Sequence, residues 1–214
     1  MTEYKKKYFL WALGCQMNKS DGERIAAILD SLDYEETHSE MEADLIMVVA
    51  CSVRQSAIDR IHGKTKRWIE WKKTRPILLA LSGCVLPGDK PQFSEIFDIL
   101  FNVPEMEKLP QLIAEQMKET EDVIPSSNYF KIAPKIKSAF SAWVPIMTGC
   151  NQRCTYCAVP YTRGKELSRP ASEVIKEIQR YLECGYKEIT VLGQTIDAYI
   201  NPEKNHQVRN FSDI

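Results

Sequence analysis

Short apolar runs alternate with amphipathic stretches along the first half of the chain. The runs at residues 8–13, 45–50 and 77–81 are long enough for buried strands and too short for typical helices. Residues 99–103 predict a fourth strand, and residues 105–118 carry a helical pattern. Because strands alternate with helices, we expect an α/β fold built on a parallel sheet with right-handed crossovers.

Two segments with capping-box spacing predict where the first helices begin. Ser20 and Glu23 have this spacing and predict a helix that runs through about residue 32. Ser52 and Gln55 have the same spacing and predict a second helix that runs toward Trp71.

The pattern changes at residues 119–142, where residues 125–128 form a polar stretch and three lysines then add charge around Pro134. We interpret this stretch as a linker between an amino-terminal domain at residues 1–118 and a second domain at residues 143–214. The alternative is a long surface loop within a single domain.

A second β/α unit begins after the predicted linker. Residues 143–147 predict a strand, residues 170–183 predict a helix with Gly185 as its C-cap, and residues 187–192 predict another strand. A cysteine-rich loop lies between the first of these strands and the helix.

The composition is that of an ordinary globular protein. The chain has 214 residues, is 44% hydrophobic, and has 28 Lys and Arg against 29 Asp and Glu. These values exclude a disordered tail, a fibre and a highly basic nucleic-acid coat. No apolar run reaches the roughly 18 residues of a membrane span, and the apolar run at residues 8–13 is short for a signal peptide. We therefore expect a cytoplasmic protein with no membrane association.

Three of the seven cysteines follow predicted strands. Cys15, Cys51 and Cys84 each lie just beyond the end of a strand, and the carboxyl ends of parallel strands share one edge of a sheet. We expect these three thiols to converge there. The alternative is three independent buried thiols, because free cysteine is often buried.

Three further cysteines lie in one loop with the spacing Cys150-x3-Cys154-x2-Cys157. No fourth Cys or His is nearby, so a structural zinc site would be incomplete. A four-iron cluster held by three thiolates keeps one iron open for a ligand from outside the protein. The amino and carboxylate groups of S-adenosylmethionine can chelate such an iron.

The Cys150-x3-Cys154-x2-Cys157 loop resembles the signature of the radical S-adenosylmethionine enzymes. The flanking segments are similar to those of the methylthiotransferases, most of all the branch that acts on isopentenyladenosine at position 37 of tRNA. These segments are Gly14-Cys15-Gln16-Met17-Asn18, Cys51-Ser52-Val53-Arg54, Gly83-Cys84, residues 154–164, Ser168-Arg169-Pro170 and Leu192-Gly193-Gln194.

The resemblance implies two four-iron clusters and S-adenosylmethionine as cofactors. Cys15, Cys51 and Cys84 would hold an auxiliary cluster, and the loop cysteines Cys150, Cys154 and Cys157 would hold the radical-generating one. It further implies that Tyr156 lies near the adenine and that three residues lie near the cofactor: Arg163, Ser168 and Gln194.

The resemblance also implies an enzyme that methylthiolates tRNA. Its partners would be tRNA and an electron donor such as flavodoxin or ferredoxin, and the protein would be a monomer. The family has a longer partial barrel followed by an RNA-binding β-domain, so we expect this chain to be a truncated, amino-terminal half of such an enzyme.

Other functions stay open from the sequence. Within the family, the substrate could be threonylcarbamoyladenosine in tRNA or a side chain of a ribosomal protein. A protein of another class, a non-catalytic iron–sulfur or zinc module, is the second alternative. The segment at residues 54–75 carries eight basic residues against Asp59 and Glu70. These charges could attract the anionic backbone of tRNA, or they could simply form the solvated face of a helix. Cys184 has no partner at motif spacing, and we assign it no ligand role.

Overall fold

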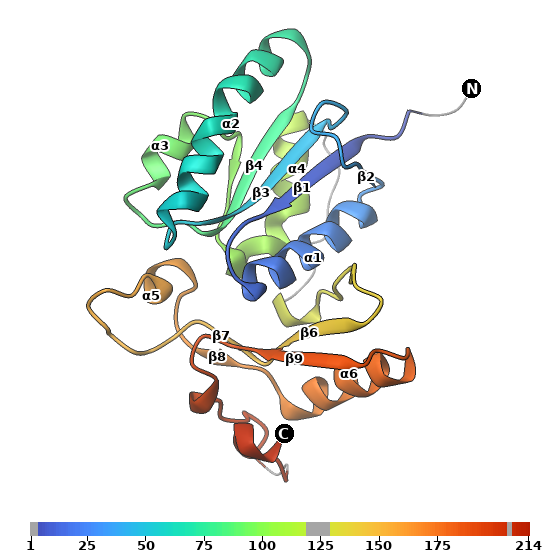
Figure 1. The fold of residues 1–214 in the computed structure, drawn as a ribbon, viewed down its shortest axis with the longest axis vertical. Coiled ribbons are helices and arrows are strands. Elements are labelled where there is room, and N and C mark those ends of the chain that lie inside the picture. Colours follow the sequence, from blue (N-terminus) through green and yellow to red (C-terminus); the bar gives the residue numbers. More distant parts are fainter. Residues whose placement is uncertain (1–3, 119–128, 205–206) are drawn as a thin grey trace. The chain divides into compact units, whose positions relative to one another are not determined.

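The structure is a computed structural model that describes residues 4–118, 129–204 and 207–214. The chain divides into two compact units, Met1–Lys135 and Ile136–Ile214 (Figure 1). The division falls within the predicted linker at residues 119–142. Residues 119–128 of that linker lie outside the described residues.

The first unit is built on a five-stranded parallel sheet with the strand order β2-β1-β3-β4-β5. The strands are β1 (Lys7–Ala12), β2 (Glu35–Glu36), β3 (Leu45–Cys51), β4 (Leu78–Cys84) and β5 (Ile99–Leu100). Helices α1 (Gln16–Ser31), α2 (Gln55–Thr74) and α3 (Lys90–Ser94) lie between strands, and α4 (Leu109–Met117) follows β5. Helices α2 and α3 cover one face of the sheet and α1 and α4 the other (Figure 1). The predicted α/β fold is confirmed.

The core of this unit is centred on β3, in which every residue is buried. A strand covered on both faces is expected to be continuously apolar, which is the pattern of this segment. On the α2 side, the fully buried Trp68 makes edge-on contacts with Trp11 and Phe97. The segment at residues 8–13 forms the inner strand β1, paired with β2 on one side and β3 on the other.

The first predicted capping box is wrong. Helix α1 begins at Gln16 with Cys15 at its N-cap, so Ser20 and Glu23 lie inside the helix. The hydroxyl of Ser20 accepts a hydrogen bond from the guanidinium of Arg24 at 2.8 Å instead of capping the helix. The helix therefore begins about one turn earlier than predicted, only a few residues after the end of β1.

The second predicted capping box is also wrong. Helix α2 begins at Gln55 with Arg54 at its N-cap, and no side chain caps it. The hydroxyl of Ser52 accepts a hydrogen bond from the backbone N–H of Leu86 at 3.2 Å. This hydroxyl therefore ties the loop after β3 to the loop after β4.

The last strand of the sheet is shorter than predicted. β5 ends at Leu100, and a 3-10 helix, η1 (Val103–Lys108), follows where residues 99–103 predicted a strand. Asn102 caps this turn: its side-chain amide donates to Glu105 at 2.7 Å. Pro104 has no N–H for a sheet ladder, which favours an early end to the strand. Helix α4 consequently begins at Leu109 rather than at residue 105.

The later part of the predicted linker packs on the first unit. A short 3-10 helix, η2 (Tyr129–Lys131), opens this segment, and the Tyr129 hydroxyl donates to buried Asp21 at 2.8 Å. Lys135 donates its backbone N–H to the Glu23 carbonyl at 2.9 Å and pairs with Asp30 at 2.9 Å. The chain is thus anchored to α1 up to the boundary between the units.

The second unit contains a parallel pair of strands and an antiparallel pair. β6 (Ser141–Pro145) pairs with β9 (Glu188–Leu192), and β7 (Met147–Thr148) pairs with β8 (Leu167–Ser168). Its helical elements are α5 (Val159–Thr162), α6 (Ala171–Glu183), η3 (Ile196–Ala198) and η4 (Phe211–Asp213). Helix α6 packs on the β6–β9 pair through Val174 and Tyr181, which gives the β/α/β unit expected at the start of a barrel.

Gly185 ends α6 as predicted. Its φ is +87°, and the backbone N–H of Tyr186 donates to the carbonyl of Tyr181 at 3.0 Å, which is the hydrogen bond of a Schellman C-cap. Across both units, none of the helices described is long and apolar enough to cross a membrane.

Candidate metal centres

The carboxyl edge of the first sheet brings together Cys51 and Cys84, at the ends of two strands, and Cys15, which follows a third. Cys51 and Cys84 are the last residues of β3 and β4 and are direct partners in the strand register. The N–H of Ser52 donates to the carbonyl of Cys84 at 2.8 Å, which extends the pairing beyond them. Cys15 follows β1 as the N-cap of α1. Cys51 and Cys84 are buried, whereas Cys15 is exposed.

Two glycines allow the backbone to approach these cysteines. Gly14 has a φ of +102°, and a β-carbon added to it would lie 2.8 Å from Cβ of Cys51. Gly83 has a φ of +100°, and an added β-carbon would lie 2.4 Å from the carbonyl oxygen of Ala50. Any other residue at these positions would collide with the strand end that carries Cys51.

Asn18 holds this edge together from its centre. The side chain is fully buried, and its amide nitrogen donates to the carbonyl of Leu13 at 2.8 Å and to that of Ala50 at 2.7 Å. Its oxygen faces the sulfur of Cys15 at 3.9 Å and the sulfur of Cys84 at 3.6 Å. The sequence contained this residue in the Gln-Met-Asn segment, but no local pattern indicated that it would reach three strands.

The donor set at this edge consists of the sulfurs of Cys15, Cys51 and Cys84, and thiolate sulfur is the ligand type of iron–sulfur clusters. No three Cys, His, Asp or Glu side chains among the described residues are arranged to hold one metal ion. A four-iron cluster presents a different iron to each thiolate, so its ligands need not meet at one point. Soft thiolates are also the ligands that iron–sulfur clusters require.

The other cysteine set lies in the long connection between β7 and β8. These strands pair Met147 with Ser168 and Thr148 with Leu167. Gly149 has a φ of +76°, and a β-carbon on it would lie 2.1 Å from the carbonyl oxygen of Lys165. The two ends of the connection are therefore held against each other, and the cysteines lie in a loop that is closed at its base.

The three loop cysteines differ in their surroundings. Cys150 is 7% exposed, and its sulfur contacts the backbone N–H of Gln152 at 3.4 Å and the hydroxyl of Thr195 at 3.0 Å. Cys154 is exposed, and Cys157 is half-buried with its N–H donating to the carbonyl of Cys154 at 3.0 Å. The loop thus offers one shielded thiol and two accessible ones.

The predicted cofactor-contacting residues occupy different environments. Tyr156 is 90% exposed on the cysteine loop, whereas Arg163 is buried at its far end. Ser168 lies in β8, and its hydroxyl accepts from the N–H of Ile200 at 3.4 Å. Gln194 follows β9, and its side-chain oxygen is buried with no hydrogen-bond partner among the residues described.

The buried oxygen of Gln194 has a counterpart on β7. The hydroxyl oxygen of Thr148 is likewise buried without a partner in the described part of the chain. Gly193 lies so close to Met147 that an added β-carbon would be 2.6 Å from Cγ of that methionine, which brings the two segments together. Unpaired buried polar atoms are costly, so these two oxygens fit a ligand that donates hydrogen bonds, such as the ammonium group of S-adenosylmethionine.

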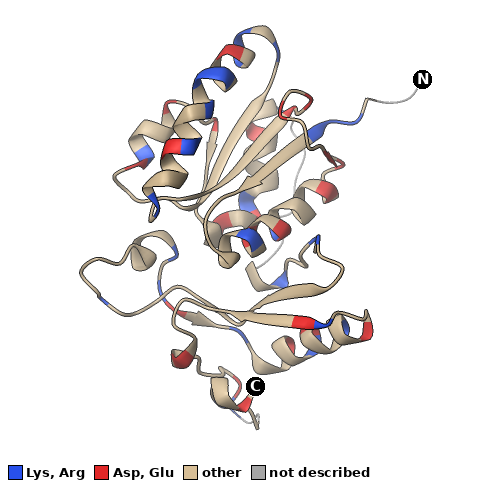
Figure 2. Ribbon diagram, viewed as in Figure 1, with Lys and Arg blue, Asp and Glu red and all other residues tan. Residues whose placement is uncertain are grey.

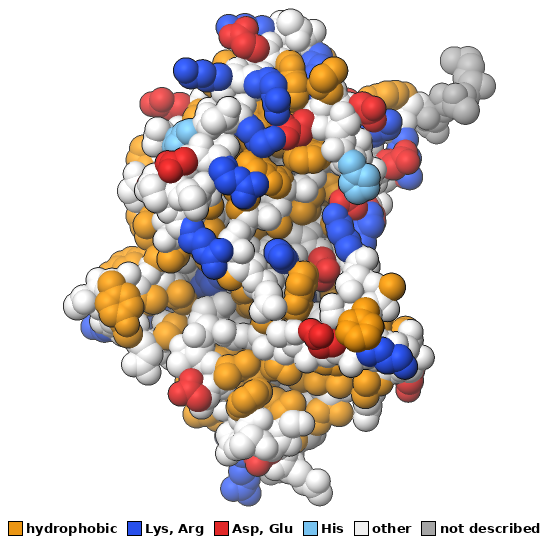
Figure 3. Space-filling view, viewed as in Figure 1, with side chains coloured by type: hydrophobic (Ala, Val, Ile, Leu, Met, Phe, Trp, Pro, Cys, Tyr) orange, Lys and Arg blue, Asp and Glu red, His pale blue; other side chains and the backbone are white. Residues whose placement is uncertain are grey.

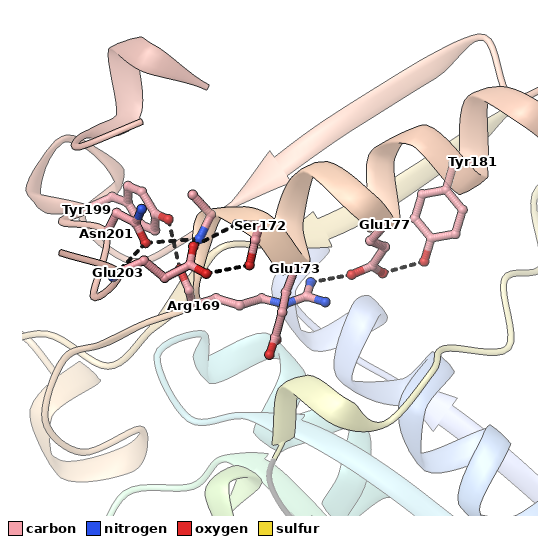
Figure 4. Close-up of polar contacts among 9 residues, drawn as sticks. Arg169, Ser172, Glu173, Glu177, Tyr181, Tyr199, Asn201 and Glu203 are labelled. Atoms are coloured by element: carbon pink, nitrogen blue, oxygen red, sulfur yellow. Dashed lines mark hydrogen bonds and ion pairs between the residues drawn. The ribbon is translucent and has the colours of Figure 1, made fainter. Parts of the chain in front are cut away.

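A buried polar network that the sequence did not predict fixes the turn between β8 and α6 (Figure 4). The guanidinium of Arg169 pairs with Glu177, which also accepts from the hydroxyl of Tyr181. Asn201 accepts from the N–H of Ala171 at 3.1 Å. The 4-residue spacing of Arg169, Glu173, Glu177 and Tyr181 was a signal for part of this network.

The basic residues of α2 are largely paired. Lys64 and Arg67 contact Glu40, and Lys72 contacts Asp98. Figure 2 shows acidic residues among the basic ones along this helix, and Figure 3 shows acidic and basic side chains close together on the same part of the surface. The pairing reduces the net positive field that the eight basic residues of this segment suggested.

Comparisons with known proteins agree with this division of the chain. Residues 7–102 match the family described as Uncharacterized protein family UPF0004, and residues 144–210 match the Radical SAM superfamily. The second match implies a four-iron cluster and S-adenosylmethionine as cofactors.

Similar curated proteins carry the name tRNA-2-methylthio-N(6)-dimethylallyladenosine synthase. The protein of Syntrophomonas wolfei is 38% identical over 90% of this chain and 45% of its own length. That of Bacillus mycoides is 36% identical over 91% of this chain and 40% of its own length. That of Vibrio vulnificus is 32% identical over 98% of this chain and 46% of its own length. The chain spans less than half the length of these relatives.

Both family matches and these relatives lead to one assignment. The chain belongs to the radical S-adenosylmethionine methylthiotransferase family.

Proposed function

We propose that this chain provides the cluster-binding part of an enzyme that methylthiolates N6-isopentenyladenosine at position 37 of tRNA. The observation that carries the proposal is the pair of cysteine sets: Cys15, Cys51 and Cys84 at one sheet edge, and a closed loop with Cys150, Cys154 and Cys157. The names of the relatives support this substrate over a ribosomal protein.

The two sets have separate roles in this proposal. Cys150, Cys154 and Cys157 hold the radical-generating four-iron cluster, and the three cysteines at the sheet edge hold an auxiliary one. When bound, these groups supply reductive cleavage of S-adenosylmethionine and delivery of the methylthio group.

The protein's own residues bind and orient the cofactor. The buried oxygens of Gln194 and Thr148 accept hydrogen bonds from its ammonium group, which would satisfy both of them. Tyr156, exposed on the cysteine loop, provides an aromatic face for the adenine. Arg163 and Ser168 complete the predicted binding residues.

The proposal includes two partners and a cellular location. The substrate is tRNA, and a flavodoxin or ferredoxin supplies single electrons. The protein acts as a monomer in the cytoplasm, where tRNA is modified.

Anaerobic reconstitution of the 214-residue chain tests the cluster assignment. Two four-iron clusters correspond to about eight irons per chain. Cys51→Ala should reduce this to about four and retain reductive cleavage of S-adenosylmethionine. Cys150→Ala should abolish formation of 5′-deoxyadenosine, and the exposed Cys184→Ala is the matched control with full iron content. Stoichiometric zinc without iron would contradict the proposal and favour a non-catalytic zinc module.

Nucleoside analysis tests the substrate. A strain that lacks the gene should lose the methylthio group from isopentenyladenosine in bulk tRNA, as measured by mass spectrometry. Loss confined to threonylcarbamoyladenosine or to a ribosomal protein would overturn the substrate assignment and leave the cluster assignment intact.

A further inference from the structure

Thr195 places a hydroxyl group beside one of the three loop cysteines. Its Oγ1 lies 3.0 Å from Sγ of Cys150, 45 residues away in the sequence. The Thr195 backbone is fixed at the start of η3, because its carbonyl accepts from the N–H of Ala198 at 2.8 Å. Gly193, two residues before Thr195, packs directly against Met147 in β7, the strand before the cysteine loop. This contact is therefore built from two segments that are each held in place.

Which of the two groups donates this hydrogen bond depends on whether Cys150 is a neutral thiol or an iron-bound thiolate. A neutral thiol and a hydroxyl can each donate, but a cysteine bound to iron is a thiolate and can only accept. The hydroxyl of Thr195 must then be the donor. The Cys150 sulfur also accepts from the N–H of Gln152 at 3.4 Å, so two donors face it.

Burial increases the effect of the donor. Cys150 is 7% exposed, whereas Cys154 is an exposed residue of the same loop. Water screens charge on an exposed thiolate, and a buried thiolate depends on the protein dipoles around it. Hydrogen bonds to cluster sulfurs and solvent exposure are among the factors that set the reduction potential.

We propose that Thr195 is a positioning residue for the radical-generating cluster: its hydroxyl hydrogen bond orients Cys150 and raises the reduction potential of the cluster bound there. The inference rests on the proposed function, because it requires iron at Cys150. The reduced cluster carries one additional electron, taken from an external reductant, and the hydroxyl stabilises that charge without transferring its proton.

A redox titration of the reconstituted 214-residue chain tests this inference. All variants carry Cys51→Ala, so that the cluster at Cys150 is observed by itself, and dithionite reduction is followed by electron paramagnetic resonance. Thr195→Val keeps the shape and removes the hydroxyl, and should shift the midpoint potential to a lower value. Thr195→Ser should restore it. Thr190→Val is the matched control in β9, where Thr190 is the register partner of Trp143 in β6, and should leave the potential unchanged.

The outcomes separate the two proposals. A parent protein without iron at Cys150 contradicts the proposed function. Full iron loading with the same potential in Thr195→Val as in the parent overturns the role of Thr195 alone. Loss of iron in a Thr195→Val protein that keeps its circular dichroism spectrum supports the positioning role. If the valine variant does not fold, Thr195→Ala provides the smaller replacement, and an unchanged potential there also overturns the inference.

Discussion

The side-chain oxygen of Asn18 lies 3.6 Å from the sulfur of Cys84, although 66 residues separate them in the sequence. The same side chain donates to the carbonyl of Leu13, just after β1, and to that of Ala50, near the end of β3. One buried amide therefore connects the carboxyl ends of the three cysteine-bearing strands. This explains how cysteines from three separate β/α units share one edge.

Replacement of Asn18 should weaken both the fold and binding of the proposed auxiliary cluster. Asn18→Ala leaves the carbonyls of Leu13 and Ala50 without their donor, at a cost of about 1–3 kcal/mol in the free energy of unfolding. Urea unfolding of the apoprotein measures this cost, and iron analysis after reconstitution measures cluster loading, which should fall. Gln55→Ala removes an exposed amide whose contact is with Asp59 and should change neither quantity. Full stability and full iron content in Asn18→Ala would contradict the role we assign to this amide.

Gly83 should tolerate no β-carbon. Gly83→Ala combines a φ of +100° with an added atom 2.4 Å from the carbonyl oxygen of Ala50. Strain of this kind costs about 1–3 kcal/mol or more, measured by urea unfolding. Gly63→Ala is the matched control in α2, where an added β-carbon meets nothing within 4 Å. It should stabilise the protein by about 0.4–1 kcal/mol, because alanine restricts the unfolded chain.

Removal of Glu177 should destabilise α6. Glu177→Ala leaves the guanidinium of Arg169 buried without its principal carboxylate, and loss of one partner of a buried pair costs about 3–5 kcal/mol. Hydrogen exchange of the α6 amides, followed by mass spectrometry, reports this local free energy. Glu173→Ala removes a carboxylate that is 43% exposed and 3.4 Å from Arg169, and should cost about 0–1 kcal/mol. Equal exchange rates in the two variants would show that the buried pair does not hold the helix.

Glu40 should contribute to stability above acidic pH. Burial by itself raises the pKa of this carboxyl, but hydrogen bonds from Lys64, Trp68 and Arg67 outweigh it and lower the pKa below 4.5. Because the folded pKa is the lower one, the contribution is present above the unfolded pKa and is lost as pH falls through the folded value.

The pH dependence of unfolding measures this contribution. The difference in unfolding free energy between the parent and Glu40→Gln should be largest near neutral pH and should shrink below about pH 4.5. A constant difference for Glu40→Gln across this range would exclude the ionised carboxylate as its source.

Local features limited what could be predicted about helix ends. The capping boxes at Ser20 and Ser52 have suitable residues at the right spacing, yet both hydroxyls bond elsewhere, to Arg24 and to the N–H of Leu86. The start of α6 is capped from a distance by Asn201, 30 residues beyond the first helical N–H. A capping pattern describes an isolated helix, and a tertiary partner can replace it.

The sequence alone determined the longer strands, their alternation with helices and the spacing of the loop cysteines. These properties depend on hydrophobic period and on ligands a few residues apart, which the chain carries locally. Only the tertiary structure decided which groups surround the cysteines: Asn18 beside Cys84, and Thr195 beside Cys150. Strand register and the close approach at Gly14, Gly83 and Gly193 create these contacts, and both depend on packing between segments that are far apart in the chain.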